Sequence, residues 1–208
     1  MDLHTESVNK QVYSILKKDI LSRKLKPGER IDTKGIAEEY GISVMPVRSA
    51  LLQLTTNGLV INRERVGFYV RQYSQEELRD IFEVRIMYEL YCINMHSSKI
   101  DQAHVKEMIR KLEDTITPVE LDELDVEMHR MIIYASNNSF LINEYEKLQA
   151  LFTLGVYGGQ YENVVIAKKE HLDIFYAILN GDVPKASEAL KQHLERSREE
   201  IIGIYQEL

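Results

Sequence analysis

The sequence predicts a mainly α-helical protein of two domains, with its β-structure confined to one short hairpin. Apolar residues recur at helical spacing through most of the 208 residues. The alternation typical of strands is limited to two short runs, 59–62 and 67–70. The charge also divides the chain, because residues 1–72 hold 12 Lys and Arg against 8 Asp and Glu, whereas residues 73–208 hold 14 against 25. A basic domain followed by an acidic one indicates that only the first meets a polyanion.

The composition is that of a soluble globular protein, with 44% hydrophobic and 28% charged residues. The single cysteine, Cys92, excludes an intrachain disulfide and lies in an apolar run, so a buried structural thiol is expected. The N-terminus lacks the basic and apolar regions of a signal peptide, and no apolar stretch reaches the roughly 20 residues that span a bilayer. We therefore expect a cytoplasmic protein without membrane contact.

The first domain is expected to begin with an amphipathic helix over residues 8–23. Its buried face consists of Val8, Val12, Ile15, Leu16, Ile20 and Leu21. Lys26-Pro-Gly-Glu29 then turns the chain, because proline and glycine interrupt helices. A second, short helix is expected over residues 34–40, with Ile36 and Ala37 turned inward.

A third helix is expected to begin after Ser43, the predicted N-cap, with Pro46 in its first turn, where a missing N–H costs little. It ends at Asn57-Gly58, and the two alternating runs follow as a hairpin joined by residues 63–66. Helix, helix, tight turn, helix and two-stranded ribbon is the order of a winged helix-turn-helix, whose third helix enters the DNA major groove. The alternative is a helical bundle with an incidental hairpin.

Several segments of this domain carry a family resemblance. They are Ile20–Ile31, Ile36–Ser43, Pro46-Val-Arg48, Ala50-Leu51 and Gly58-Leu-Val60. Through them, residues 8–72 resemble the winged-helix domain of the GntR family of bacterial transcription regulators. The resemblance implies a double-stranded DNA operator as the partner, and because one winged helix covers only one half-site, a homodimer on a near-palindromic operator.

The DNA-contacting residues expected from the resemblance and from the exposed turn and wing are Lys34, Ser43, Val44, Met45, Arg48, Arg63, Arg65 and Gly67. Lys34 is implied at a phosphate, Arg48 at a guanine or the backbone, and Gly67 in the wing near the minor groove. The family usually has an arginine where this chain has Val44, which can at most pack on a thymine methyl. The operator is therefore expected to differ from the common family sequence, or binding relies more on the wing arginines.

The second domain, residues 73–208, is expected to be an all-α antiparallel bundle of about six helices. Ser74 and Glu77 form a capping box that opens the first helix, Asp101 caps the second, and Thr117-Pro118 opens the third. The expected helices cover residues 75–98, 102–114, 118–136, 139–153, 161–180 and 183–205.

Four polar residues of this domain have a spacing that predicts convergence. Asp125 and His129 are four residues apart on one helix, so they share a face. His171 and His193 each lie eleven residues from Asp182, so an antiparallel hairpin places them at one level, roughly 16 Å from the turn. Three imidazoles and a carboxylate favour a divalent transition metal. The alternative is an Asp–His pair on a solvated helix face.

The order Ile81–Arg85, Glu89, Asp125, His129, Ala135–Asn138, Glu170-His171 and His193 carries a second resemblance. Residues 74–206 resemble the FCD ligand-binding domain, which defines the FadR subgroup of GntR regulators. Members with this Asp-His-His-His set bind a divalent metal, so the resemblance implies Asp125, His129, His171 and His193 as ligands of Zn or Ni, or of Mn or Fe. It also implies that Arg85 neutralises an effector carboxylate, although a surface ion pair with Glu89 is the alternative.

These observations together predict a transcription regulator that acts as a repressor, and not an enzyme. Its operator affinity would be controlled by a small organic acid bound at the metal, where four protein ligands leave two octahedral positions for effector oxygens. A metalloenzyme that activates water is the first alternative. Against it, helix geometry turns Glu127 and Glu170 away from the neighbouring ligands in the sequence. A sensor of the metal ion itself is the second.

Overall fold

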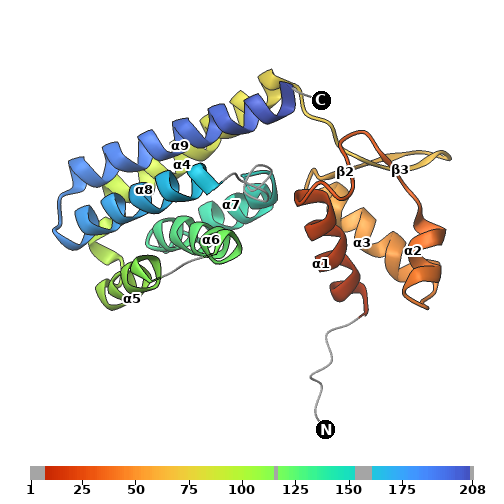
Figure 1. Ribbon diagram of the computed structural model, residues 1–208, viewed down its shortest axis with the longest axis horizontal. Coiled ribbons are helices and arrows are strands. Elements are labelled where there is room, and N and C mark those ends of the chain that lie inside the picture. Colours follow the sequence, from red (N-terminus) through yellow and green to blue (C-terminus); the bar gives the residue numbers. More distant parts are fainter. Residues whose placement is uncertain (1–7, 115–116, 153–160, 207–208) are drawn as a thin grey trace, which may run out of the picture. The chain divides into compact units, whose positions relative to one another are not determined.

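The computed structural model describes residues 8–114, 117–152 and 161–206 (Figure 1). The chain divides into two compact units, Met1–Tyr73 and Ser74–Leu208. The described residues are mainly helical, with one small antiparallel sheet in the first unit. This confirms the predicted fold class. Within the same residues, no helix is long and apolar enough to cross a membrane.

The first unit is a winged helix-turn-helix. Its elements are α1 (Val8–Leu21), β1 (Arg30–Ile31), α2 (Thr33–Glu39), α3 (Val44–Thr56), β2 (Val60–Arg63) and β3 (Gly67–Val70). Helices α1 and α3 pack against each other, and their buried side chains are Val12, Leu16, Ile20, Leu21, Val47, Ala50, Leu51 and Leu54. The predicted inward faces are confirmed except at three positions: Val8 on α1 is 47% exposed, and Ile15 on α1 and Ile36 on α2 are only half-buried.

The sheet corrects one prediction, because the wing has three strands and not two. The strand order is β1-β3-β2, all antiparallel, with Arg30 opposite Tyr69 and Ile31 opposite Phe68. A strand of two residues is too short to show alternation, so no sequence pattern predicts it. Burial of Ile31 in the core is what fixes β1 against the hairpin.

The second unit is an antiparallel helical bundle. Its elements are α4 (Gln75–His96), the 3₁₀ turn η1 (Ser97–Lys99), α5 (Gln102–Glu113), α6 (Pro118–Tyr134), α7 (Ser139–Phe152), α8 (Tyr161–Leu179) and α9 (Val183–Gln206). These bounds agree with the predicted helices to within about two residues at each end; the predicted last residue of the fourth, 153, lies outside the described residues.

The predicted caps explain where these helices begin. Ser74 accepts from the backbone N–H of Glu77, whose side chain accepts from Ser74 in return, so the capping box is formed. Thr117 and Glu120 form a second such box, and Asp101 accepts from the N–H of Ala103.

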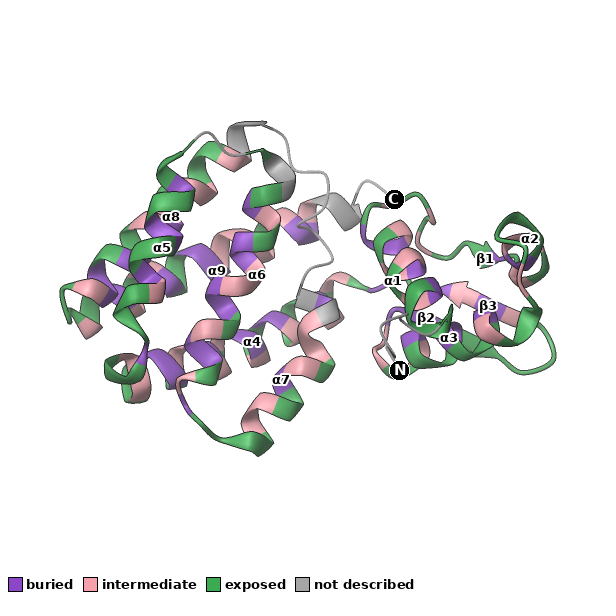
Figure 2. Cartoon of the chain, turned by 90° about the horizontal axis from the view of Figure 1, so that it is seen from below, coloured by how far each residue is buried: buried purple, intermediate pink, exposed green. Residues whose placement is uncertain are grey.

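The bundle buries an apolar core between its helices. Helix α4 packs along α9 and also contacts α6 and α7, and α8 packs against α9 (Figure 1). Buried and exposed residues alternate along each helix, as expected for amphipathic helices (Figure 2). Cys92 is fully buried in this core, as predicted, and burial raises the pKa of its thiol to about 11. The cysteine is therefore a packing residue and a poor nucleophile.

Candidate metal centre and nucleic-acid interface

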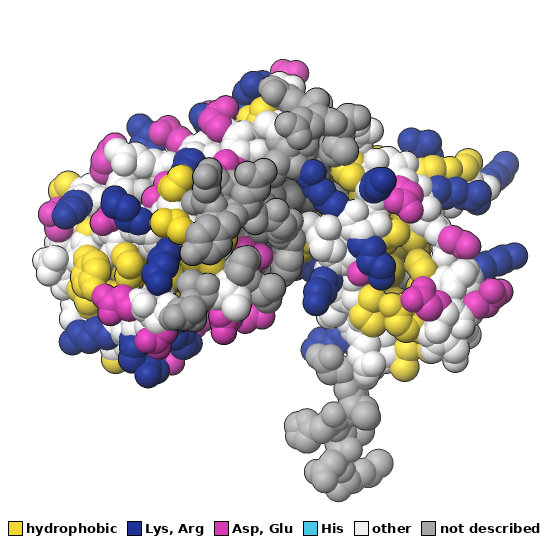
Figure 3. All heavy atoms as spheres, viewed as in Figure 1, with side chains coloured by type: hydrophobic (Ala, Val, Ile, Leu, Met, Phe, Trp, Pro, Cys, Tyr) yellow, Lys and Arg dark blue, Asp and Glu magenta, His cyan; other side chains and the backbone are white. Residues whose placement is uncertain are grey.

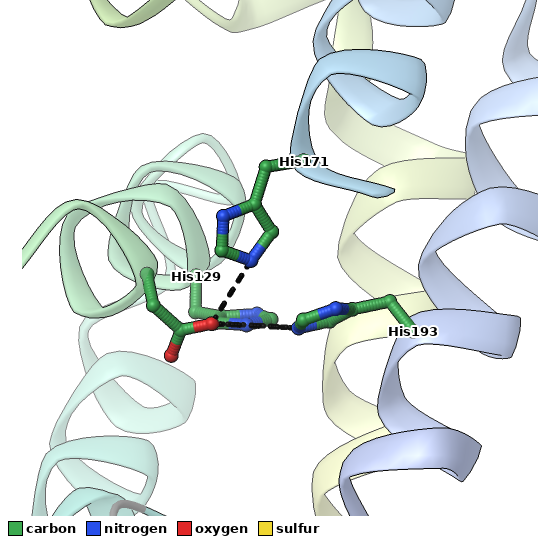
Figure 4. Close-up of side chains that lie close together, drawn as sticks. His129, His171 and His193 are labelled. Carbon is green, nitrogen blue, oxygen red and sulfur yellow. Dashed lines mark hydrogen bonds and ion pairs between the residues drawn. The ribbon is translucent and has the colours of Figure 1, made fainter. Parts of the chain in front are cut away.

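Asp125, His129, His171 and His193 converge inside the second unit. One ligand atom of each lies within 4.8 Å of the other three, which is a spacing that could hold a metal ion. Figure 4 shows the three imidazoles turned toward one another from different helices. The Oδ1 atom of Asp125 is 3.0 Å from His171 Nε2, 3.3 Å from His129 Nε2 and 3.4 Å from His193 Nε2. We call these four residues the metal centre.

The local sequence explains this convergence. Asp125 and His129 point from one face of α6, as residues four apart do. His171 on α8 and His193 on α9 meet because the chain reverses midway between them: Gly181 has a φ of +66°, and Asp182 accepts from the backbone N–H of Lys185. The three histidines are almost fully buried and Asp125 is 9% exposed, so the alternative of a solvated Asp–His pair is wrong.

A buried glutamate on α4 holds the first of these histidines. Glu89 is fully buried, and its carboxylate accepts from His129 Nδ1, from Arg85 Nε at 2.8 Å and from Tyr145 Oη at 3.1 Å. The ion pair of Arg85 with Glu89 exists, but both side chains are buried, which corrects the expectation of a surface pair. The reason is that α4 is covered by α9 as well as by α6 and α7.

A second glutamate holds His193. Glu170 on α8 accepts from His193 Nδ1 at 2.8 Å and is itself bound by Arg196 through two hydrogen bonds of 2.7 and 2.8 Å. Glu170 was predicted to point away from its neighbour His171, but its contact with His193 across the hairpin was not predicted. The contact could have been predicted from the sequence, because Glu170 is only one residue farther from Asp182 than His193 is. The two residues therefore lie at nearly the same height in the hairpin of α8 and α9. Glu127 instead pairs with His104, at 2.8 Å and away from the metal centre.

The charges of this cluster suit cation binding. Burial alone would raise the pKa of Glu89, but the contacts of its carboxylate with His129 and Arg85 outweigh burial and lower the pKa to about 2. The pKa of Asp125 is likewise lowered well below its usual range, because the histidines around it outweigh its burial. Burial lowers the pKa of His171 to about 4. At neutral pH the carboxylates are therefore ionised and His171 is neutral, which are the forms that bind metals.

The donor geometry also fits a cation. An ionised carboxylate can only accept, so His129 and His193 each carry a proton on Nδ1 where they meet Glu89 and Glu170. In their neutral forms, their Nε2 atoms are then both lone-pair acceptors, yet they lie 3.2 Å apart. Two facing lone pairs repel unless a proton or a metal ion stands between them. The residues present therefore fit a divalent ion.

The first unit carries a hollow between α2, α3 and the β2–β3 hairpin. Its volume is about 680 Å³, and its lining includes the basic residues Arg30, Lys34, Arg48, Arg63 and Arg65 together with Val44 and Gly67. Lys and Arg side chains gather at the hairpin end in Figure 3. Of the residues predicted to contact DNA, only Ser43 and Met45 are absent from the lining. Both are exposed at the start of α3, where Met45 is 71% exposed.

Ring contacts and backbone geometry shape this hollow. The guanidinium of Arg63 stacks 4.3 Å from the ring centre of Tyr69, and that of Arg48 lies 5.8 Å from the ring centre of Phe68. Gly67 has a φ of +133°, which residues with a Cβ rarely adopt. Arg30, which sequence reasoning missed, donates to the carbonyl of Val66 at 3.1 Å and so joins β1 to the wing loop.

Comparison with known families identifies both units. The family model described as bacterial regulatory proteins, gntR family, matches residues 8–70. The FCD domain model matches residues 80–196, which is more than half of the chain. This chain belongs to the GntR family of regulators and carries an FCD domain. The resemblance stated from its sequence motifs is thereby confirmed.

Curated relatives and solved structures of GntR regulators agree with this assignment. The HTH-type transcriptional repressor RspR of Escherichia coli K12 is 28% identical over 212 residues, covering 98% of this chain and 92% of RspR. A GntR regulator from Rhodococcus sp. RHA1 has the same fold, with a TM-score of 0.78 at 20% identity, over 95% of this chain and 99% of that one. The Zn²⁺-bound FCD domain of TM0439 is 27% identical, with a TM-score of 0.54, over 62% of this chain and 94% of that domain.

These GntR and FCD proteins are transcription regulators and not enzymes. The protein is accordingly a DNA-binding transcription regulator, and the metalloenzyme alternative is removed. Its second unit brings together four residues that could hold a metal ion, as the FCD domain of TM0439 holds Zn²⁺.

Proposed function

We propose that this GntR protein is a repressor whose operator affinity is controlled by a small carboxylate bound at a divalent metal in the FCD domain. The observation that carries the proposal is the buried convergence of Asp125, His129, His171 and His193. Residues 1–72 would bind DNA, and residues 73–208 would bind metal and effector. The proposed location is the cytoplasm, where the operator is.

The proposed metal is Zn or Ni, with Mn or Fe as further candidates. Three imidazole nitrogens and one carboxylate are donors that these ions share. The Zn²⁺-bound FCD domain of TM0439 favours zinc as the first ion to test. When bound, an octahedral ion would offer two further positions to a bidentate hydroxy- or dicarboxylate.

Arg85 is the proposed partner of the effector carboxylate. It is buried on α4 next to Glu89, which in turn contacts His129 of the metal centre. The position is therefore close to the proposed ion, and a guanidinium binds carboxylates through two parallel hydrogen bonds. An effector at this position would share Arg85 with Glu89, so its binding would change the strength of that ion pair.

A thermal-shift screen of small carboxylic acids on the zinc-loaded protein tests this function. We expect a hydroxy- or dicarboxylate to raise the melting temperature of loaded protein but not of chelator-treated protein. The same acid should change the dissociation constant for the operator, because a ligand shifts an equilibrium only through unequal affinity for its states. If operator affinity follows Zn²⁺ concentration with no acid present, the protein is a sensor of the ion itself. Acids without any effect on loaded protein would contradict the proposal.

The proposed DNA contacts are Lys34, Ser43, Val44, Met45, Arg48, Arg63, Arg65 and Gly67. Replacing Arg48 with alanine is expected to weaken specific operator binding by about 1–3 kcal/mol, because a base-reading arginine is lost. Fluorescence anisotropy with operator and scrambled DNA measures the difference. Zinc content should stay unchanged, and its loss in this variant would contradict the assignment of the two functions to separate domains.

The proposed active form is a homodimer on a near-palindromic operator. The exposed face of α4 supports a contact between copies, because Met87, Tyr91 and Met95 recur every four residues and are at least half exposed. Replacing Met87 and Met95 with glutamate is expected to give a monomer in sedimentation experiments. Val165→Glu, at an exposed apolar position on α8, is the matched control. A wild type that sediments as a monomer at micromolar concentration would contradict the proposed dimer.

A further inference from the structure

The three histidines of the metal centre differ in how their outer nitrogens are held. His129 Nδ1 meets Glu89 and His193 Nδ1 meets Glu170, so two rings are each tied to a carboxylate on another helix. His171 Nδ1 is buried and has no hydrogen-bond partner among the described residues. Among the described residues, two of the three histidines of the metal centre are therefore held by a carboxylate at Nδ1, and His171 is not.

Each supporting glutamate is itself fixed. Glu89 accepts hydrogen bonds from Arg85 and Tyr145, and Glu170 accepts two from the guanidinium of Arg196. A carboxylate held in this way cannot turn to follow the imidazole, so the imidazole must orient to the carboxylate. Its Nδ1 proton is then held by that carboxylate, and its Nε2 atom points into the metal centre.

We propose that Glu89 and Glu170 are positioning residues that preset His129 and His193 for the metal, whereas His171 must change its tautomer to join them. The inference rests on the proposed metal site and adds which residues prepare it. Without metal, His171 Nε2 lies 3.0 Å from Asp125 Oδ1, so this nitrogen carries the proton and donates it to the carboxylate. As a ligand through Nε2, His171 must carry its proton on Nδ1 instead. The ring keeps one proton throughout, so no net charge is gained or lost.

Zinc titration of matched glutamate variants tests the positioning role. Glu170→Ala is expected to lower Zn²⁺ affinity by about 10–100-fold while keeping one site per chain, because all four ligands remain. Glu89→Gln, which preserves the shape of the buried side chain, should lower it by a similar factor. Glu127→Ala is the matched control, since this nearby glutamate pairs with His104 and not with the metal centre. Wild-type affinity in folded Glu170→Ala and Glu89→Gln would overturn the proposal.

Imidazole nitrogen NMR of the metal-free protein gives a readout independent of metal. We expect His129 and His193 in the Nδ1–H form and His171 in the Nε2–H form, with His193 losing its preference in Glu170→Ala. Zinc should convert His171 to the Nδ1–H form. Mixed tautomers at His129 and His193 in wild type would overturn the proposal. A wild type with these tautomers that takes up no Zn²⁺ would instead refute the metal site on which the proposal rests, so the two failures are distinguishable.

Discussion

Replacing His171 with alanine is expected to empty the metal centre and to abolish the response to the effector. The substitution removes one of the four donors that lie within 4.8 Å of one another. The loss of Zn²⁺ affinity should exceed the roughly 10–100-fold caused by removing a residue that only supports a ligand. Elemental analysis of the purified variant measures the metal content, and the operator titration with and without the effector measures the response.

His104→Ala is the matched control for this prediction. His104 is a half-buried histidine whose partner is Glu127, so its loss should leave metal content unchanged. Stoichiometric zinc retained in His171→Ala would refute the proposed ligand set. Zinc lost in both variants would show that folding, and not coordination, controls metal uptake.

Replacing Arg85 with methionine is expected to destabilise the metal-free protein by about 3–5 kcal/mol, because it leaves the buried Glu89 carboxylate without its arginine. Chemical denaturation at neutral pH measures the loss. The pKa of Glu89 is lowered to about 2 in the fold, from a usual 4.5, so the ionised form contributes stability above pH 4.5 that disappears as pH falls toward 2. The difference between wild type and variant should therefore shrink in acid.

Arg85→Lys separates the structural role of Arg85 from its proposed role in effector binding. Lysine keeps the positive charge beside Glu89, so most of the stability should remain. It lacks the planar fork that binds a carboxylate at two points, so effector affinity should fall. If Arg85→Lys binds the effector as wild type does, Arg85 serves only to balance Glu89. A stable Arg85→Met variant would contradict the importance of that ion pair.

The helices were predictable because their signals are local. Ser74 with Glu77 forms the capping box that their spacing predicts, and Thr117 caps the helix that Thr117-Pro118 was predicted to open. The convergence of His171 and His193 was predictable for a related reason, because equal distances from Asp182 become equal heights in a tight hairpin. Whether the four converging residues bind metal remains a prediction.

The features missed by sequence reasoning depend on contacts distant in the chain. Strand β1 exists only because Arg30 and Ile31 pair with β3, and two residues carry no period of their own. The pair of Arg85 and Glu89 has the spacing of an ordinary surface ion pair. Its burial follows from the helices that cover α4, and no local pattern in α4 reveals them.

Helix α4 extends from the boundary between the two units past Glu89, the residue that contacts His129 of the metal centre. Helix α4 begins at Gln75, immediately after the capping residue Ser74 that opens the second unit. Glu89 lies roughly 21 Å along the same helix, at about 1.5 Å per residue. A continuous helix transmits a twist along its axis, since its backbone hydrogen bonds resist local unwinding. A twist of α4 at the contact between Glu89 and His129 would therefore reach Gln75, where this helix begins next to the boundary between the two units.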